Sequence, residues 1–451
     1  MPSTYHRKRG LIEVLVVIII VIALVGGYFW YSRIHTTASA PAVAAYQTPA
    51  EASNVYVRFD MEAYDSIVKN YWQTPTDTQL SQLYQSSLVK ALSLMNIADA
   101  STTLATSDRT GTANMLANAF TYATTTDAKK NLAVGILQVA VYNLPPSGRD
   151  ELLSQTQQVA LRQEVNNVNP STNLYDNLGV PTGASVSAVD AAYKAKAAVL
   201  AASSSPEAKA ALVQLNYAHQ VLSNTQTKAR YDTSQVEPTI FSSIMGSTLY
   251  VYISKMSPTT LAEFQDALTN ASSTPGLSSM IIDLRGNIGG SLTDAASFLG
   301  YFLGSNQYAF DLYAQNIYNV VRTTDDRDPK LARYREVAVL TDGMTQSTAE
   351  VLTAALKRYH IAYSVGATTR GWGTVENTFP LQTTTDASTT YALLLVHAIT
   401  LRDDQQPIQG RGVDPDVAIS DANWKVELSN YFTSPGIIAA LKKEADQPPI
   451  Q

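Results

Sequence analysis

The longest run of apolar positions lies close to the start of the chain. Residues 11–31 read LIEVLVVIIIVIALVGGYFWY, with Glu13 as the one charged side chain. About twenty apolar residues are what a helix needs to cross the hydrocarbon core of a bilayer. Arg7, Lys8 and Arg9 precede the run, and basic residues favour the cytoplasmic side. The pattern predicts a single-pass anchor in the cell membrane, with residues 1–10 cytoplasmic and the bulk of the chain extracytoplasmic.

Two other interpretations of this segment stay open. A cleaved signal peptide also begins with basic residues and an apolar run, and Ala38-Ser39-Ala40 has the small residues at which such peptides are cut. The start RGLIEVLVVI is similar to a type IV prepilin leader. Residues 32–54, rich in Ala, Thr and Pro, are expected to form a linker.

Helical periodicity dominates residues 55–170. Leu, Val and Tyr recur at helical spacing in AYDSIVKNYW, LSQLYQSSLVKALSLM and AKKNLAVGILQVAVYNL. Pro145 and Pro146 interrupt the pattern, because proline lacks the backbone donor that a helix interior needs. The following RDELLSQTQQVALRQEV is expected to be partly helical. We expect a helical arm with a packed apolar core and no functional site.

Short apolar runs alternate with helical segments over residues 236–430. The clearest strands are LYVYIS, MIIDLR, VAVLTD, AYSVG and YALLLVHAI. Helices are expected from about Pro258, Ser291 and Ser347. Strands alternating with helices indicate an α/β core built on a mixed sheet. Residues 431–451 are expected to form a short helical tail that ends in polar residues.

Composition narrows the possible functions. The chain has 451 residues, of which 45% are hydrophobic and 16% charged, which fits several folded units with a substantial core. A net charge of −6 and the lack of a basic stripe argue against nucleic acid as a partner. The absence of cysteine excludes disulfides, thiolate metal sites and a cysteine nucleophile. No group of His, Asp and Glu has metal-ligand spacing, so we expect neither metal nor cofactor.

The segment from Val337 to Glu376 carries the candidate chemistry. It reads as a strand, the turn GMTQ, a helix opened by Ser347, a second strand and the loop ATTRGWGTVE. This pattern resembles the C-terminal processing (tail-specific) serine peptidases, whose motif is roughly S-A-S-A-S-E, then V-G, then T-F-G-K-G-T-V-Q. The resemblance places the nucleophile at Ser347 and the glutamate at Glu350. The family's lysine falls on Trp372, and its glutamine falls on Glu376.

Four further stretches extend the resemblance. They are the strand and glycine turn MIIDLRGNIGGS, the preceding GSTLYVYISKMSPTTLAEFQDAL, the closing IQGRGVDPDV, and FDMEAYDSIVKNYW, which is similar to the family's N-terminal helical arm. Their order matches the family's order. The resemblance implies that the backbone N–H groups of Gly289 and Gly290 stabilise an oxyanion together with the start of the Ser347 helix.

The base that a catalytic serine needs is missing from its expected place. In the family a buried lysine accepts the serine proton after desolvation has lowered its pKa. Trp372 has no basic nitrogen, and Arg370 stays protonated. Lys357 lies ten residues along the helix from Ser347, about 15 Å away. Ser347 and Glu350 also fit the S-x-x-E capping box, which requires no catalysis.

Residues 171–235 resemble a J-domain, inserted where the peptidase family usually carries a PDZ module. The landmarks include Leu178-Gly179-Val180, Asn216-Tyr217-Ala218 and Arg230-Tyr231-Asp232. The segment that should read H-P-D reads Ala201-Ala202-Ser203, and the preceding helix has lost most of its basic face. Stimulation of a chaperone ATPase is therefore not expected, and the unit is interpreted as a helical spacer or protein-binding module. His219 is expected to be structural.

Two functional hypotheses follow. In the first, the protein is a membrane-anchored pseudopeptidase that binds extended or unfolded polypeptide without cutting it. In the second, it is an active serine endopeptidase that cleaves C-terminal or unfolded segments with a different base. The two degenerate motifs, at Trp372 and at Ala201-Ala202-Ser203, favour the first.

Overall fold

The computed structural model describes residues 48–386, 389–402 and 404–449. The predicted cytoplasmic stub, the anchor at residues 11–31 and most of the predicted linker lie outside these residues. The described end of that linker differs from the prediction, because residues 49–53 form helix α2 (Pro49–Ser53), which Thr48 and Glu51 cap reciprocally. Within the described ranges, no helix combines the length and the apolar character needed to span a bilayer.

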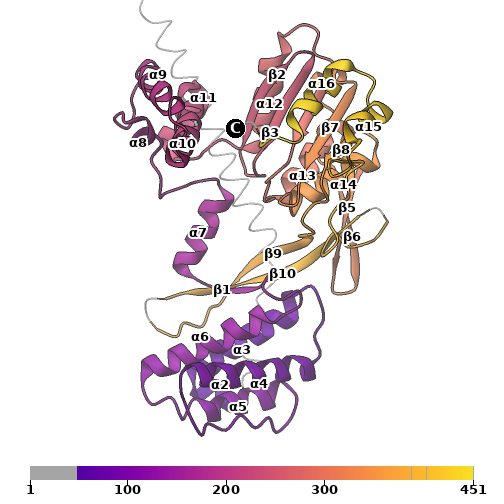
Figure 1. Ribbon diagram of the computed structural model, residues 1–451. Coiled ribbons are helices and arrows are strands. Elements are labelled where there is room, and N and C mark those ends of the chain that lie inside the picture. Colours follow the sequence, from indigo (N-terminus) through magenta and orange to yellow (C-terminus); the bar gives the residue numbers. More distant parts are fainter. Residues whose placement is uncertain (1–47, 387–388, 403, 450–451) are drawn as a thin grey trace, which may run out of the picture.

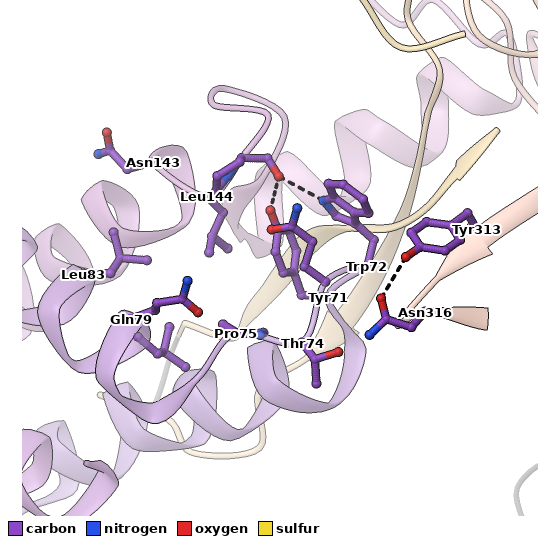
Figure 2. A pocket seen from close by; sticks show the side chains of 13 residues that line it. Tyr71, Trp72, Thr74, Pro75, Gln79, Leu83, Asn143, Leu144, Tyr313 and Asn316 are labelled. Atoms are coloured by element: carbon purple, nitrogen blue, oxygen red, sulfur yellow. Dashed lines mark hydrogen bonds between the residues drawn. The ribbon is translucent and has the colours of Figure 1, made fainter. Parts of the chain in front are cut away.

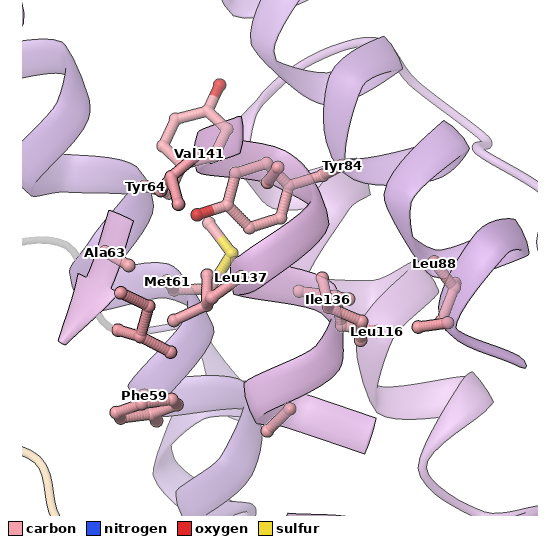
Figure 3. Close-up of a cluster of buried hydrophobic side chains, with 14 of the residues drawn as sticks. Phe59, Met61, Ala63, Tyr64, Tyr84, Leu88, Leu116, Ile136, Leu137 and Val141 are labelled. Carbon is pink, nitrogen blue, oxygen red and sulfur yellow. The ribbon is translucent and has the colours of Figure 1, made fainter. Parts of the chain in front are cut away.

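A bundle of helices forms the N-terminal arm (Figure 1). After α2 it contains α3 (Val55–Asn70), α4 (Asp77–Leu94), α5 (Arg109–Ala119) and α6 (Thr126–Tyr142). Asn54, Thr76, Asp108 and Thr125 accept hydrogen bonds from the first free N–H groups of α3 to α6, in that order. The apolar faces meet in one buried core, which includes Phe59, Met61, Leu88, Leu116 and Ile136 (Figure 3).

The core domain contains a six-stranded sheet of order β11-β8-β7-β4-β3-β2. Its strands are β2 (Ile240–Met245), β3 (Thr248–Ile253), β4 (Ser279–Asp283), β7 (Glu336–Thr341), β8 (Tyr363–Gly366) and β11 (Val417–Ala418). β2 pairs antiparallel to β3, and the other neighbours are parallel. The predicted mixed α/β core is therefore confirmed.

Helices cover both faces of this sheet. One face packs against α12 (Thr260–Ser272), α13 (Leu292–Leu303) and α14 (Thr348–Arg358). The other packs against α15 (Trp424–Tyr431) and α16 (Pro435–Glu444). Ile437 and Leu441 of α16 are fully buried on the sheet, so much of the expected C-terminal tail is part of the core.

A second, antiparallel sheet connects the core to the arm (Figure 1). Its strands run in the order β1-β10-β5-β6, and β9 also pairs with β10. They are β1 (Glu151–Ser154), β5 (Tyr308–Ala314), β6 (Ile317–Arg322), β9 (Thr374–Pro380) and β10 (Tyr391–Leu401). The segment that was expected to be partly helical begins with β1 and continues as helix α7 (Gln155–Val165). Its Leu152 and Leu153 are buried against β10, and this distant pairing outweighs the local helical pattern.

The J-like module lies between the arm and the core in sequence. Helix α7 (Gln155–Val165) leads to α8 (Leu174–Leu178), α9 (Val186–Ala201), α10 (Pro206–Ser223) and α11 (Thr225–Ser234). Helices α8 to α11 enclose a small apolar core around Tyr175, Val189 and Leu222. His219 bonds Asp190 through Nε2 at 2.8 Å and stacks on Tyr193 at 3.9 Å. These contacts tie α10 to α9.

Candidate functional site

Ser347 occupies a sharp turn between strand β7 and helix α14. Its backbone has φ 56° and ψ −125°, a conformation that is rare for a residue with a side chain. The Asp342 side chain stabilises the turn, because Oδ1 accepts from the N–H groups of Gly286, Met344 and Thr345 at 2.8–3.0 Å. A strained turn from strand to helix is the arrangement that presents the nucleophilic serine of many hydrolases.

The glycine turn after β4 lies directly against Ser347. Gly289 has φ +88°, and a Cβ added there would lie 2.6 Å from the Cβ of Ser347. A Cβ on Gly290 would lie 1.9 Å from the carbonyl oxygen of Met256. Only glycine fits either position, so both predicted residues are brought to the serine.

The two glycines differ in their available N–H groups. The Gly289 N–H donates to Oδ1 of Asn287 at 2.8 Å, so the donor that the sequence assigned to an oxyanion is already used within the turn. Among the described residues, the N–H groups of Gly290 and Thr348 have no hydrogen-bond partner. Thr348 is the first residue of α14, where the helix dipole adds to the field of its N–H. Gly290 and Thr348 are therefore the available donors beside the serine.

Glu350 joins the serine turn to the loop that carries Trp372. Its buried carboxylate accepts four hydrogen bonds: from the N–H groups of Ser347 at 2.8 Å and of Gly371 and Trp372 at 2.7 Å each, and from Thr369 Oγ1 at 2.5 Å. Burial raises the pKa of Glu350, although these hydrogen bonds oppose the shift. The residue therefore does more than the predicted helix cap.

Trp372 is held beside the serine by three neighbours. Its indole Nε1 donates to Glu376 Oε1 at 3.2 Å. The guanidinium carbon of Arg149 lies 3.1 Å from the ring centroid, and that of Arg370 lies 5.3 Å away. The N–H groups of Trp372 and Ser347 share one acceptor, Oε2 of Glu350, so the two residues are close in space.

In the described part of the chain, Ser347 forms no hydrogen bond with a lysine, histidine or arginine nitrogen. Lys357 forms an ion pair with Asp416 at 3.2 Å instead. In the same ranges, no three His, Asp or Glu side chains converge to hold a metal ion.

Two residues near Trp372 were not anticipated from the sequence. Arg149 and Asp150 precede β1, more than two hundred residues before Trp372 in the chain. Asp150 is fully buried, and its Oδ1 accepts from the Val396 N–H at 2.6 Å. Burial, with a smaller effect from Glu376, raises the pKa of Asp150 to about 7. Neither residue lies in a recognisable motif, so only the docking of arm and core reveals them.

Comparisons with known proteins agree with this geometry. Residues 247–419 match the model of peptidase family S41, and residues 173–232 match the DnaJ domain. A probable CtpA-like serine protease of Staphylococcus aureus (strain N315) is 29% identical over 180 residues, which are 40% of this chain and 35% of that protein. The corresponding protein of Staphylococcus epidermidis is 28% identical over 198 residues, or 44% and 38% of the two chains.

The alignment thus spans little more than a third of these relatives. Among solved structures, a photosystem II D1 C-terminal processing protease is 13% identical, with 87% of this chain and 98% of that chain covered and a TM-score of 0.47. The segments that match the two family models, residues 247–419 and 173–232, coincide with the core and with the J-like module. The core of this chain, at residues 247–419, thus matches peptidase family S41, the C-terminal processing peptidases, and the segment that precedes it in sequence matches the DnaJ domain.

Proposed function

We propose that this protein is a membrane-anchored, extracytoplasmic pseudopeptidase that binds extended or unfolded polypeptide at the Ser347 site without cleaving it. The observation that carries the proposal is Trp372, which stands where the family has its lysine. An indole cannot accept the serine proton, and its contacts with Arg149 and Glu376 hold it in place. Loss of one member of a coupled nucleophile system costs orders of magnitude in rate.

One feature favours the alternative of an active peptidase. Ser347 keeps its strained backbone, with φ 56°, and lies against glycines that leave the Gly290 N–H available. Strain of this kind costs free energy and is concentrated at functional sites. If the protein is active, a base other than the family lysine must accept the serine proton.

A comparison of three proteins separates the two functions. Full-length wild type, Ser347→Ala and Trp372→Lys are each incubated with an unfolded polypeptide, and both its retention and its cleavage are measured. We expect the wild type to retain the polypeptide and leave it intact. A lysine at position 372 would lie beside Arg149 and Arg370, whose charges lower its pKa, and beside Glu376, whose charge opposes that shift. We therefore expect cleavage by Trp372→Lys alone.

Other outcomes of this comparison are equally informative. Cleavage by the wild type that Ser347→Ala abolishes would contradict the pseudopeptidase proposal and establish an enzyme with a different base. Trp372→Phe serves as the control variant, since it keeps an aromatic ring over Arg149 and adds no amine. If Trp372→Lys is inactive but as stable as the control, loss of the lysine does not by itself explain inactivity.

The proposed location rests on the apolar run and the basic residues before it. We expect full-length protein to fractionate with membranes, and externally added protease to digest the arm and the core but not residues 1–10. Release of a soluble mature protein by the cell would favour the cleaved signal peptide instead. On the outer side of the membrane the J-like module meets no ATP-driven chaperone, which supports its role as a spacer or protein-binding unit.

A further inference from the structure

A pocket of about 470 Å³ lies between the arm and the β5–β6 hairpin, and no residue of the Ser347 site lines it (Figure 2). Three segments build it: the connection from α3 to α4 with the first turns of α4, the residues that follow α6, and the tip of the hairpin. The lining residues are Tyr71, Trp72, Gln73, Thr74, Pro75, Gln79, Leu80, Leu83, Asn143, Leu144, Pro145, Tyr313 and Asn316. None of them carries a charge.

Aromatic rings form a row along this pocket. The ring centroids of Tyr71 and Trp72 are 6.2 Å apart, and those of Trp72 and Tyr313 are 6.4 Å apart. Tyr318 continues the row onto β6, 4.9 Å from Tyr313, with 58% of its surface exposed. β6 is an edge strand of its sheet. The row therefore leads from an open sheet edge into the pocket.

Several hydrogen-bond acceptors of the pocket are already used. The Pro145 carbonyl accepts from the Tyr71 hydroxyl and from Trp72 Nε1, the latter at 2.9 Å. Oδ1 of Asn316 accepts from the Tyr313 hydroxyl at 2.8 Å, and Oε1 of Gln79 accepts from the Thr76 N–H at 2.9 Å. In Figure 2, dashed lines mark these hydrogen bonds of Tyr71 and Trp72 and the one between Tyr313 and Asn316.

Two side-chain amide donors of the pocket are unused. The side-chain NH₂ groups of Gln79 and Asn316 form no hydrogen bond with any residue that the structure describes. The pocket thus offers aromatic surface, two amide donors and no charge. It suits a neutral ligand that has hydrogen-bond acceptors and an apolar surface.

We propose that this pocket binds an uncharged, proline-containing segment of extended polypeptide. A prolyl residue keeps its carbonyl acceptor but has no N–H, which matches the unused donors. Proline-rich segments in the polyproline II conformation dock against aromatic-lined grooves, because they are already extended and lose little entropy on binding.

The pocket and the Ser347 site lie along the same pair of strands. The Trp72 N–H donates to the Val396 carbonyl of β10 at 2.9 Å, and Val396 pairs with Glu376 of β9. Glu376 in turn accepts from the Trp372 indole. A polypeptide bound in the pocket therefore has a second attachment point, beyond the proposed binding at Ser347.

The test measures the affinity of full-length protein for a labelled, N-acetylated and C-amidated peptide of alternating alanine and proline, by fluorescence anisotropy. Gln79→Glu keeps the oxygen that caps α4 but replaces the NH₂ donor with a charge. Asn316→Gly removes the amide at a position with φ 64°, which glycine adopts readily. We expect each variant to bind the peptide about fivefold to tenfold more weakly.

Matched controls isolate the pocket. Gln157→Glu makes the same change in the equivalent capping role of α7, where Oε1 accepts from the Ser154 N–H at 2.9 Å, and we expect it to bind as the wild type does. A peptide with glycine and serine in place of proline should bind weakly to all variants. These variants leave Ser347 and Trp372 unchanged, so this test can fail while the pseudopeptidase proposal stands, and the reverse.

Two results would overturn the proposal. One is equal affinity of wild type, Gln79→Glu and Asn316→Gly for the proline peptide, including no binding by any of them. The other is that a neutral oligosaccharide binds the wild type and binds Gln79→Glu more weakly, while the affinity for the proline peptide is the same for both proteins.

Discussion

At the scale of single residues, the Ser347 site depends on backbone conformations that few residues can adopt. Ser347 and Gly289 both have positive φ, and their atoms are in direct contact. The serine turn is held by Asp342, and the loop at Trp372 is held by Glu350. The site therefore retains its framework although the lysine is absent.

Gly289→Ala should disrupt this framework. The new Cβ would lie 2.6 Å from the Cβ of Ser347, at a backbone φ of +88°. Gly276→Ala is the matched control, because Gly276 has φ +74° but nothing within 4 Å of the added Cβ. We expect the control to lose about 1–2 kcal/mol from backbone strain alone. Gly289→Ala should lose more unfolding free energy than the control, and it should retain unfolded polypeptide more weakly.

Chemical denaturation of the two variants measures the difference. Equal losses of unfolding free energy would show that the contact with Ser347 relaxes without cost, and that the close packing of the glycine turn is not required.

At the scale of elements, the sequence predicted the strands that are continuous apolar runs. It missed the strands that lack such a run. The strands β3, β4, β7, β8 and β10 were expected, because continuous apolar runs are visible in a single sequence. Strands β1, β2, β5, β6, β9 and β11 were not, since they are half-exposed or short. Strands β1, β5 and β11 pair with strands far away in the chain, so no local pattern records them.

An ion-pair network joins three elements of the arm. Arg109, the first residue of α5, bonds Glu51 of α2 at 2.7 Å and Asp65 of α3 at 2.7 Å. Arg109→Met should lower the free energy of unfolding by about 1–3 kcal/mol, because it leaves the buried Glu51 carboxylate without its cation. Lys425→Met, which breaks an exposed pair with Asp446, should cost less than about 1 kcal/mol.

Urea unfolding of the two variants compares a partly buried network with a surface pair. If Arg109→Met loses no more unfolding free energy than Lys425→Met, water replaces the arginine and the network does not stabilise the arm.

At the scale of the whole molecule, the arm reaches the candidate site through Arg149 and Asp150. Arg149 stacks on Trp372, and Asp150 accepts a hydrogen bond from β10. Burial raises the pKa of Asp150 to about 7, so this contact between arm and core depends on pH.

Asp150→Asn should remove this dependence. A carboxyl whose pKa is higher in the folded state than in the unfolded state contributes to the free energy of unfolding. This contribution is complete at a pH below the unfolded-state pKa, and it is lost as the pH rises through the folded-state pKa. The stability of the wild type should therefore fall relative to the variant between an ordinary aspartate pKa of 3.8 and about 7. Asparagine keeps the oxygen that accepts from Val396.

Unfolding free energies at a series of pH values across this window provide the test. Asp60, another buried carboxyl with a raised pKa, is present in both proteins, so the difference between them reports Asp150 alone. Parallel pH profiles would mean that Asp150 titrates normally in the folded protein.

The sequence by itself determined the order of the units, the family of the core, the J-like module and the replacement of lysine by Trp372, because each is written in contiguous motifs or apolar runs. Only the tertiary structure decided that Arg149 lies on Trp372, that Asn287 uses the Gly289 N–H, and that a neutral pocket opens between arm and hairpin. The physical reason is distance along the chain. Most of these contacts join segments far apart in sequence, and all of them depend on side-chain packing, which no local pattern records.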